Sequence, residues 1–168
     1  MTFLYPGLKK SSTELRTVPC IELSVVDFLR KLNLSKTTMR QQLNDIIHAS
    51  SFSIEDGMFV YAKVKSWPDE NHFMVTKDGD EITVVTQSEN VTTLDLIERN
   101  KDDYRLIALN VAIPFYCVGF LARISQAIAD SGMNILIVST YSKDYVLVKA
   151  DQLEDARDTL LKLGFSET

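Results

Sequence analysis

The last third of the chain has the most regular alternation of apolar and polar positions, and its first half predicts a strand followed by a helix. Residues 104–113 place apolar side chains on both faces of an extended segment, which is typical of a buried β-strand. A helix is then expected to start near Gly119, because Phe120, Ile124 and Ile128 repeat at helical spacing.

The second half of this region predicts two more strands and a second helix. Residues 133–139 are almost wholly apolar, and a tight turn separates them from a strand over residues 145–149. Asp151 is the expected N-cap of the next helix, with Glu154 in a position close to the capping-box pattern. Gly164 is expected to end that helix.

The middle of the chain changes to a period of two and to β-branched residues. Residues 58–64 read as a strand, and residues 73–76 and 81–86 as a hairpin. Gly79 follows an aspartate in the connection of that hairpin and supplies the backbone freedom that the turn needs. Residues 93–99 are expected to form one or two helical turns.

From residue 104 onward the predicted order is strand, helix, strand, strand, helix. This order lacks only the last strand of a ferredoxin-like βαββαβ unit, so the predicted fold class is α+β. Residues 58–64 are the expected donor of the missing strand. The two halves of the chain would then share strands, because separating them would expose unpaired sheet edges.

Residues 1–57 are expected to form a partly helical N-terminal extension, followed by modules over residues 58–103 and 104–168. The extension is nearly neutral whereas the rest of the chain is net acidic, and this shift sets the boundary. Helices are expected over residues 24–32 and after Ser35. Two helices that cover a sheet face, or a helix-turn-helix, are the alternatives here.

Composition narrows the function classes. The chain has 168 residues, of which 45% are hydrophobic and 24% charged, and its net charge is −5. The net negative charge argues against a protein that coats nucleic acid.

The cysteines and the apolar stretches bear on the cellular compartment. The two cysteines, Cys20 and Cys117, fit reduced thiols in a cytoplasmic protein. We expect no leader and no membrane span, because the longest apolar stretch, residues 111–122, is short and contains Pro114 and Gly119.

Enzymatic motifs are not found in the sequence. His48 and His72 have no second ligand at metal-binding spacing, and no glycine-rich phosphate loop is present. A spatial pair of Cys117 with His72 is the remaining catalytic hypothesis, and a small residue packed at a strand end is its alternative. We therefore expect no enzyme activity, no metal and no cofactor.

Two neighbouring segments are the best candidates for a binding site. The junction before the helix at Gly119 presents backbone N–H groups, which favour an anion such as a carboxylate. The turn after residue 139 carries Thr140, Tyr141 and Asp144, and the Asp144 carboxylate is suited to a ligand ammonium group. Together these groups match the main chain of a free amino acid. The alternative is that Asp144 only shapes its turn.

Two segments of the last third form a specific motif: Gly119-Phe-Leu-Ala-Arg-Ile124 and Ser139-Thr-Tyr-Ser-Lys-Asp-Tyr-Val-Leu-Val148. With these segments, residues 58–165 resemble tandem ACT-domain proteins of the CASTOR type, which include arginine sensors. Phe73-Met-Val-Thr76 resembles the degenerate first repeat of that family. The resemblance implies two strand-sharing, ferredoxin-like ACT modules and an amino-acid ligand at an ACT–ACT interface. The N-terminal extension has no counterpart in it.

The resemblance also implies which residues bind the ligand. The strand-to-helix loop would supply backbone contacts, and the next turn a threonine–aromatic pair and an acid. The expected ligand-binding residues are Tyr116, Cys117, Val118, Gly119, Phe120, Thr140, Tyr141 and Asp144. The first helical turn holds no acid for a guanidinium group, so arginine does not fit well.

The expected function is therefore that of a non-catalytic regulatory protein that binds an amino acid. Because the chain holds one tandem, the second half of an ACT–ACT interface would come from another copy in a homodimer. The alternative is a ligand-independent interaction scaffold or regulatory subunit that uses residues 1–57 as a docking arm for a protein partner.

Overall fold

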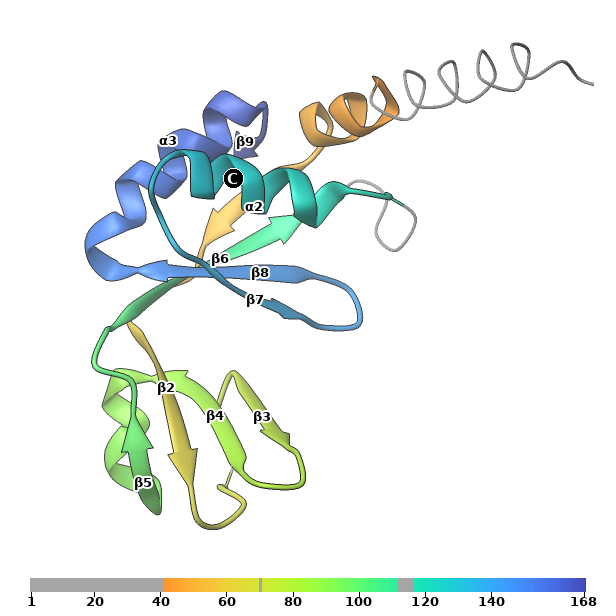
Figure 1. Ribbon diagram of the computed structural model, residues 1–168. Helices are drawn as coiled ribbons and strands as arrows, with labels where there is room; N and C mark the ends of the chain where they lie inside the picture. Colours follow the sequence, from red (N-terminus) through yellow and green to blue (C-terminus); the bar gives the residue numbers. More distant parts are fainter. Residues whose placement is uncertain (1–40, 70, 112–116) are drawn as a thin grey trace, which may run out of the picture. The chain divides into compact units, whose positions relative to one another are not determined.

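The computed structural model describes residues 41–69, 71–111 and 117–168, and residues 36–168 form one compact unit. In the described residues, two α-helices and two 3-10 helices connect strands of a mixed sheet, and residues 41–48 before the first strand are also helical (Figure 1). The connecting helices are α2 (Phe120–Asp130), α3 (Leu153–Leu163), η1 (Ser88–Thr93) and η2 (Ala150–Gln152). The strands are β1 (Ser51–Ile54), β2 (Phe59–Val64), β3 (Met74–Lys77), β4 (Ile82–Gln87), β5 (Leu96–Arg99), β6 (Tyr104–Asn110), β7 (Leu136–Ser139), β8 (Asp144–Lys149) and β9 (Ser166–Glu167).

The C-terminal part of the unit has the strand order β7-β8-β6-β1-β9, with β6 at its centre. Antiparallel pairing aligns Ile107 of β6 with Val146 of β8 on one side and with Ile54 of β1 on the other. The order strand, helix, strand, strand, helix is confirmed, and this mixed α/β arrangement is consistent with a ferredoxin-like fold.

The donor of the missing strand was predicted wrongly. Residues 58–64 form β2, which pairs with β6 only at Phe59 and Tyr104. The position beside β6 is instead taken by β1, and β9 adds a short parallel strand next to β1. β9 pairs with β1 alone, so β1, with four paired residues, supplies most of the backbone hydrogen bonds along that edge of β6.

The helices cover one face of this sheet. Ile107 and Leu109 of β6 point into a core with Ile124 and Ile128 of α2, and all four are fully buried. The alternation predicted for residues 104–113 is confirmed over Tyr104–Asn110, where β6 ends, and residues 112–113 lie outside the described residues. Residues 41–48 are helical, and Ile47 is buried in the same core. The expected helix over residues 24–32 lies outside the described residues.

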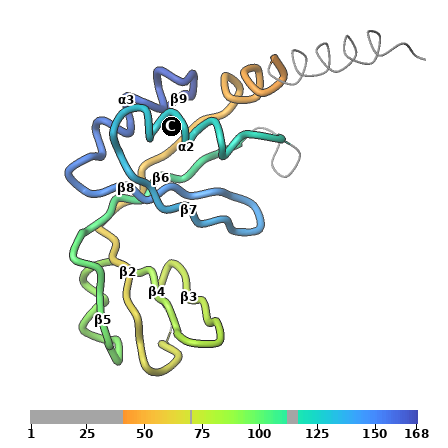
Figure 2. Tube along the Cα trace, viewed as in Figure 1, coloured from red at the N-terminus to blue at the C-terminus, as the bar shows by residue number. Residues whose placement is uncertain are grey.

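The other face of the sheet packs against a second set of strands. Leu106 of β6 and Leu147 of β8 share a core with Phe59 of β2 and Val85 of β4. The ring of Phe73 lies edge-on to Tyr145, with centroids 4.8 Å apart. Figure 2 follows the chain from β1 into β2, and back from β5 into β6.

Residues 58–69 and 71–103 contain four antiparallel strands and η1, but no α-helix. The hairpin of β3 and β4 is confirmed. The expectation of helical turns over residues 93–99 was wrong: η1 ends at Thr93, and residues 96–99 form β5 on the open side of β2.

The start of α3 differs from the sequence expectation. Residues 150–152 form a 3-10 turn, so the helix begins after Gln152 and has no side-chain cap. The capping box expected at Asp151 is therefore absent. The end is as predicted, because Gly164 adopts a left-handed conformation with φ of 115°. Within the described residues no helix is long and apolar enough to cross a bilayer.

Candidate functional site

The first wall of the candidate site is the start of α2. Gly119 precedes the helix with φ of 86°, a left-handed conformation that suits glycine. The N–H of Phe120 donates to the carbonyl of Cys117 at 3.2 Å. No described group accepts from the N–H groups of Leu121 and Ala122, and the first turn holds no acidic residue. These amides leave a local positive potential at the helix start.

The second wall is the turn between β7 and β8. The backbone N–H of Thr140 donates to the carbonyl of Lys143 at 2.8 Å, and the Thr140 hydroxyl donates to the same oxygen at 3.0 Å. These bonds fix the turn geometry. The Tyr141 side chain, at the tip of the turn, is 90% exposed.

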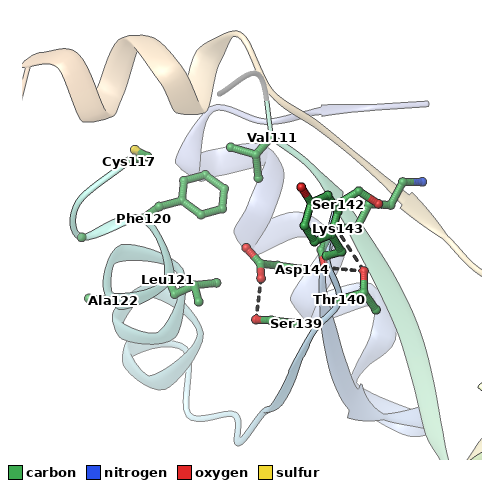
Figure 3. A pocket seen from close by; sticks show the side chains of 12 residues that line it. Val111, Cys117, Phe120, Leu121, Ala122, Ser139, Thr140, Ser142, Lys143 and Asp144 are labelled. Atoms are coloured by element: carbon green, nitrogen blue, oxygen red, sulfur yellow. Dashed lines mark hydrogen bonds between the residues drawn. The ribbon is translucent and has the colours of Figure 1, made fainter. Parts of the chain in front are cut away.

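Asp144 lies where this turn enters β8. It is opposite Ser139 in the strand register, and the Ser139 hydroxyl donates to its Oδ1 at 2.6 Å. No described group donates to the other carboxylate oxygen, Oδ2. Asp144 therefore shapes its turn, as the sequence alternative held, and also keeps one oxygen for another partner. In Figure 3 its carboxylate lies between the turn and the start of α2, near Leu121.

The two walls line a partly open cavity of about 420 Å³. This volume lies in the usual range for small-molecule sites. The cavity is lined by Val111, Cys117, Gly119, Phe120, Leu121, Ala122, Ser139, Thr140, Tyr141, Ser142, Lys143 and Asp144. The structure thus brings together six of the residues named from the sequence: Cys117, Gly119, Phe120, Thr140, Tyr141 and Asp144.

Two of the expected residues are not placed in the cavity. Val118 does not line it, and its side chain is 75% exposed. Tyr116 lies outside the described residues. The sequence reasoning missed Ser139, although it is in the quoted motif and faces Asp144. It also missed Val111 and Leu121, whose positions follow only from the approach of the strand end to the helix start.

The structure also bears on the catalytic hypothesis for Cys117. Burial raises the pKa of the Cys117 thiol, which lowers the population of reactive thiolate. The ring of His72 is hydrogen-bonded through Nδ1 to the Thr86 hydroxyl at 2.9 Å, in the β2–β5 part of the unit. A catalytic Cys117–His72 pair is not supported by these contacts. No cluster of three or more metal-ligating side chains occurs in the described part of the chain.

The family comparison agrees with this geometry. Residues 100–162 match the model of the ACT domain family. The match covers β6, α2, β7, β8 and most of α3, and it includes the β6–α2 and β7–β8 connections that line the candidate site. The search among curated proteins gives no match.

Solved structures share the fold over more of the chain than the family match. A protein of unknown function from Vibrio cholerae has a TM-score of 0.65 at 18% identity, over 75% of this chain and 98% of that one. An Agobacterium tumefaciens protein has a TM-score of 0.57 at 22% identity, over 71% and 92%. The regulatory subunit of aspartate kinase from Thermus flavus has a TM-score of 0.50 at 12% identity, over 67% and 96%.

The fold and the cavity thus define a ferredoxin-like module with a small-molecule-sized pocket at one end of its sheet. Residues 100–162 are similar to the ACT domain family, and the solved structures share the fold of the chain.

Proposed function

We propose that this protein is a non-catalytic regulator that binds a free amino acid in the cavity between α2 and the β7–β8 turn. One observation carries the proposal: the helix start and the Asp144 carboxylate face one cavity from opposite walls. Backbone N–H groups at a helix start favour a carboxylate, and an aspartate oxygen favours an ammonium group. A free amino acid carries both groups at fixed spacing.

We also propose that a second copy of the chain completes the site. Val118 and Tyr141 are 75% and 90% exposed, and they belong to the two segments that form the cavity walls. Both side chains are therefore accessible to the surface of a second copy. Residues 58–103 contain no described α-helix, so a second complete ACT module would come from another chain in a homodimer.

Other parts of the hypothesis rest on the sequence alone. These are the relationship to the CASTOR-type proteins, the division into modules over residues 58–103 and 104–168, and a cytoplasmic location. In the alternative function, a ligand-independent interaction scaffold, residues 1–57 would act as a docking arm for a protein partner.

The proposal is tested by thermal unfolding of the full chain with each standard amino acid at millimolar concentration. An amino acid at about 100 times its Kd adds about 2.7 kcal/mol of stability. For a chain of this size this raises Tm by roughly 5–10 °C. The matched variants are Asp144→Asn, which keeps the Ser139 contact but loses the charge, and Asp158→Asn, an exposed aspartate on α3.

We expect one amino acid or a small group to raise Tm in the parent and in Asp158→Asn, and the shift to vanish in Asp144→Asn. If no amino acid raises Tm while the protein remains folded, the scaffold function is favoured instead. Size-exclusion chromatography with and without the stabilising amino acid tests the homodimer.

A further inference from the structure

We propose that the outer edge of β5 binds an extended, basic segment of a partner protein, which adds a strand to the sheet beside Trp67. The inference concerns a surface within residues 58–103, and it is independent of the cavity and of the ligand proposed above. It follows from the pairing of β5, from the apolar side chains exposed along it and from the distribution of charge in the chain.

β5 has a neighbouring strand on one side only. Within the described residues it pairs with β2 alone, and Figure 1 shows it on the side of β2 opposite β4. In the register, Leu96 lies opposite Val64 and Glu98 lies opposite Lys63. Ile97 is therefore an extra residue without a partner in β2. The outer edge of such a strand presents backbone N–H and C=O groups with which an added strand can pair.

Large apolar side chains are exposed along this edge. Ile97 is 51% exposed, and Leu96 beside it is also exposed. Trp67, which is 62% exposed, belongs to the segment after β2. That segment runs beside the start of β5, because the N–H of Lys65 donates to the carbonyl of Asp95 at 2.9 Å. Tryptophan is enriched among the residues that dominate binding energy at protein interfaces, so Trp67 is the expected anchor for the added strand.

The charge of this part of the chain indicates what kind of segment fits. Residues 58–103 contain ten acidic and five basic residues, whereas the rest of the chain contains thirteen of each, so the whole net charge of −5 belongs to this part. Three of its five basic residues, Lys63, Lys65 and Arg99, are already held in ion pairs with acidic residues of the same part. The remaining negative charge attracts a basic segment and disfavours an acidic one.

The same charges disfavour a second copy of this chain at the β5 edge. Two copies joined through β5 would bring two acidic regions together, and like charges across an interface weaken binding. Charged side chains on an edge strand are a common protection against self-pairing. Asp95 and Glu98 provide that protection here and remain compatible with a basic strand. The occupant that fits is therefore a basic segment of a different protein.

The test is the binding of fluorescein-labelled hexapeptides to the full chain, measured by fluorescence anisotropy. One pool alternates lysine or arginine with valine, isoleucine or leucine, and a matched pool has aspartate or glutamate in place of the basic residues. We expect the basic pool to bind at least roughly tenfold more tightly than the acidic pool, and its affinity to fall as the salt concentration rises.

N-methylated peptides test the addition of a strand. The tightest basic peptide is made in two versions, N-methylated at odd or at even positions. Only one version lacks the N–H groups that face β5, so it should bind at least roughly tenfold more weakly than the other.

The location is tested through Trp67, which is the only tryptophan of the chain. An unlabelled basic peptide should shift the Trp67 emission to shorter wavelength and protect it from acrylamide quenching. Ile97→Lys should weaken peptide binding roughly tenfold through charge repulsion. The matched control Met58→Lys changes a side chain that is 49% exposed and lies before the other end of β2, so it should not change binding. Ile97→Thr keeps a β-branched side chain and replaces Ile97→Lys if that variant does not fold.

Each contrary result overturns a stated part of the proposal. Equal binding of the two pools overturns the basic character of the partner, and equal binding of the two N-methylated peptides overturns strand addition. Binding that survives Ile97→Lys, or that leaves the Trp67 emission unchanged, overturns the location. If no basic peptide binds the folded chain at millimolar concentration, the whole proposal is wrong. None of these results depends on the cavity, so the proposed function stands or fails separately.

Discussion

The end of α3 provides a test of how closely residues 41–48 are joined to the C-terminal strands and helices. A Cβ at Gly164 would lie 2.5 Å from both Nδ1 and Cε1 of His48, in addition to the unfavourable φ of 115°. Gly132, which follows α2, has φ of 77°, but a Cβ there meets nothing within 4 Å. Comparing an alanine substitution at each of the two glycines therefore distinguishes backbone strain from the steric conflict with His48.

The expected magnitudes follow from these two terms. Gly132→Ala has only the left-handed backbone penalty, about 1–2 kcal/mol of unfolding free energy. Gly164→Ala has the same penalty and also displaces the His48 ring. If the ring is forced off its rotamer, this adds about 0.5–1.5 kcal/mol. Gly164→Ala should therefore be the more destabilising of the two substitutions.

The assay is equilibrium unfolding in urea of the parent, Gly132→Ala, Gly164→Ala, His48→Ala and the double variant of His48 and Gly164. Removing the ring should reduce the cost of Gly164→Ala to that of Gly132→Ala. The Gly132→Ala cost should be the same with and without His48. An equal cost of Gly164→Ala in both backgrounds would refute the contact between the helical residues 41–48 and the end of α3.

Three further predictions test the strand β1, the β3–β4 turn and the cavity thiol. Phe52→Ala should lower the free energy of unfolding by about 3–5 kcal/mol, because Phe52 is fully buried in β1. The control Met58→Ala, at a side chain that is 49% exposed, should change it by at most about 0.5 kcal/mol. Equal effects of the two substitutions would contradict the placement of β1. Two backbone N–H groups donate to the Asp78 carboxylate at 2.8 and 2.9 Å and lower its pKa. The stability that these bonds add is present above the ordinary aspartate pKa and is lost as pH falls through the lowered pKa. Asp78→Asn should lack this loss, so parallel acid unfolding curves of the parent and the variant would count against the prediction. In a Cys20→Ser background, the rate of Cys117 alkylation should rise with pH around a midpoint above the ordinary cysteine pKa, because burial raises the pKa of this thiol. A midpoint below the ordinary cysteine pKa would favour the catalytic hypothesis for Cys117.

The sequence predicts best those elements whose periodicity is long. The strand β6 and the helix α2 are buried by repeating apolar positions, and both lie close to where the pattern places them. β1 is different, because it has four residues and only Phe52 and Ile54 as apolar positions. Its pairing with β6 joins segments more than fifty residues apart, and no local pattern reports such a contact.

Residues 93–99 show how local spacing misleads. Apolar residues in this segment repeat at a spacing that suits one or two helical turns, but the segment pairs with β2 instead. The N–H of Asn100 donates to the carbonyl of Tyr61 at 2.8 Å, so the neighbouring strand provides hydrogen bonds that an isolated turn would lack. Tertiary pairing therefore overrides a weak local preference.

The position of the candidate cavity follows from topology. β6 and β7 are both antiparallel to β8, so they run parallel to each other and their carboxyl ends lie at the same edge of the sheet. α2 starts after the end of β6, and the turn with Thr140 starts after the end of β7. A strand–helix–strand unit thus brings the helix start and this turn together, and ligand sites are common at such strand ends.

The chemistry of the cavity does not follow from topology in the same way. The fold requires a short connection before α2 and a tight turn after β7, and many side chains satisfy both requirements. An acid at position 121 would leave the apolar repeat of α2 intact, because the fully buried positions of that helix are Phe120, Ile124 and Ile128. The same fold would then hold a negative charge on the wall that is now apolar. The charge that lines the cavity therefore depends on single side chains at half-buried positions, and we expect substitutions at Leu121 and Asp144 to change it without changing the fold.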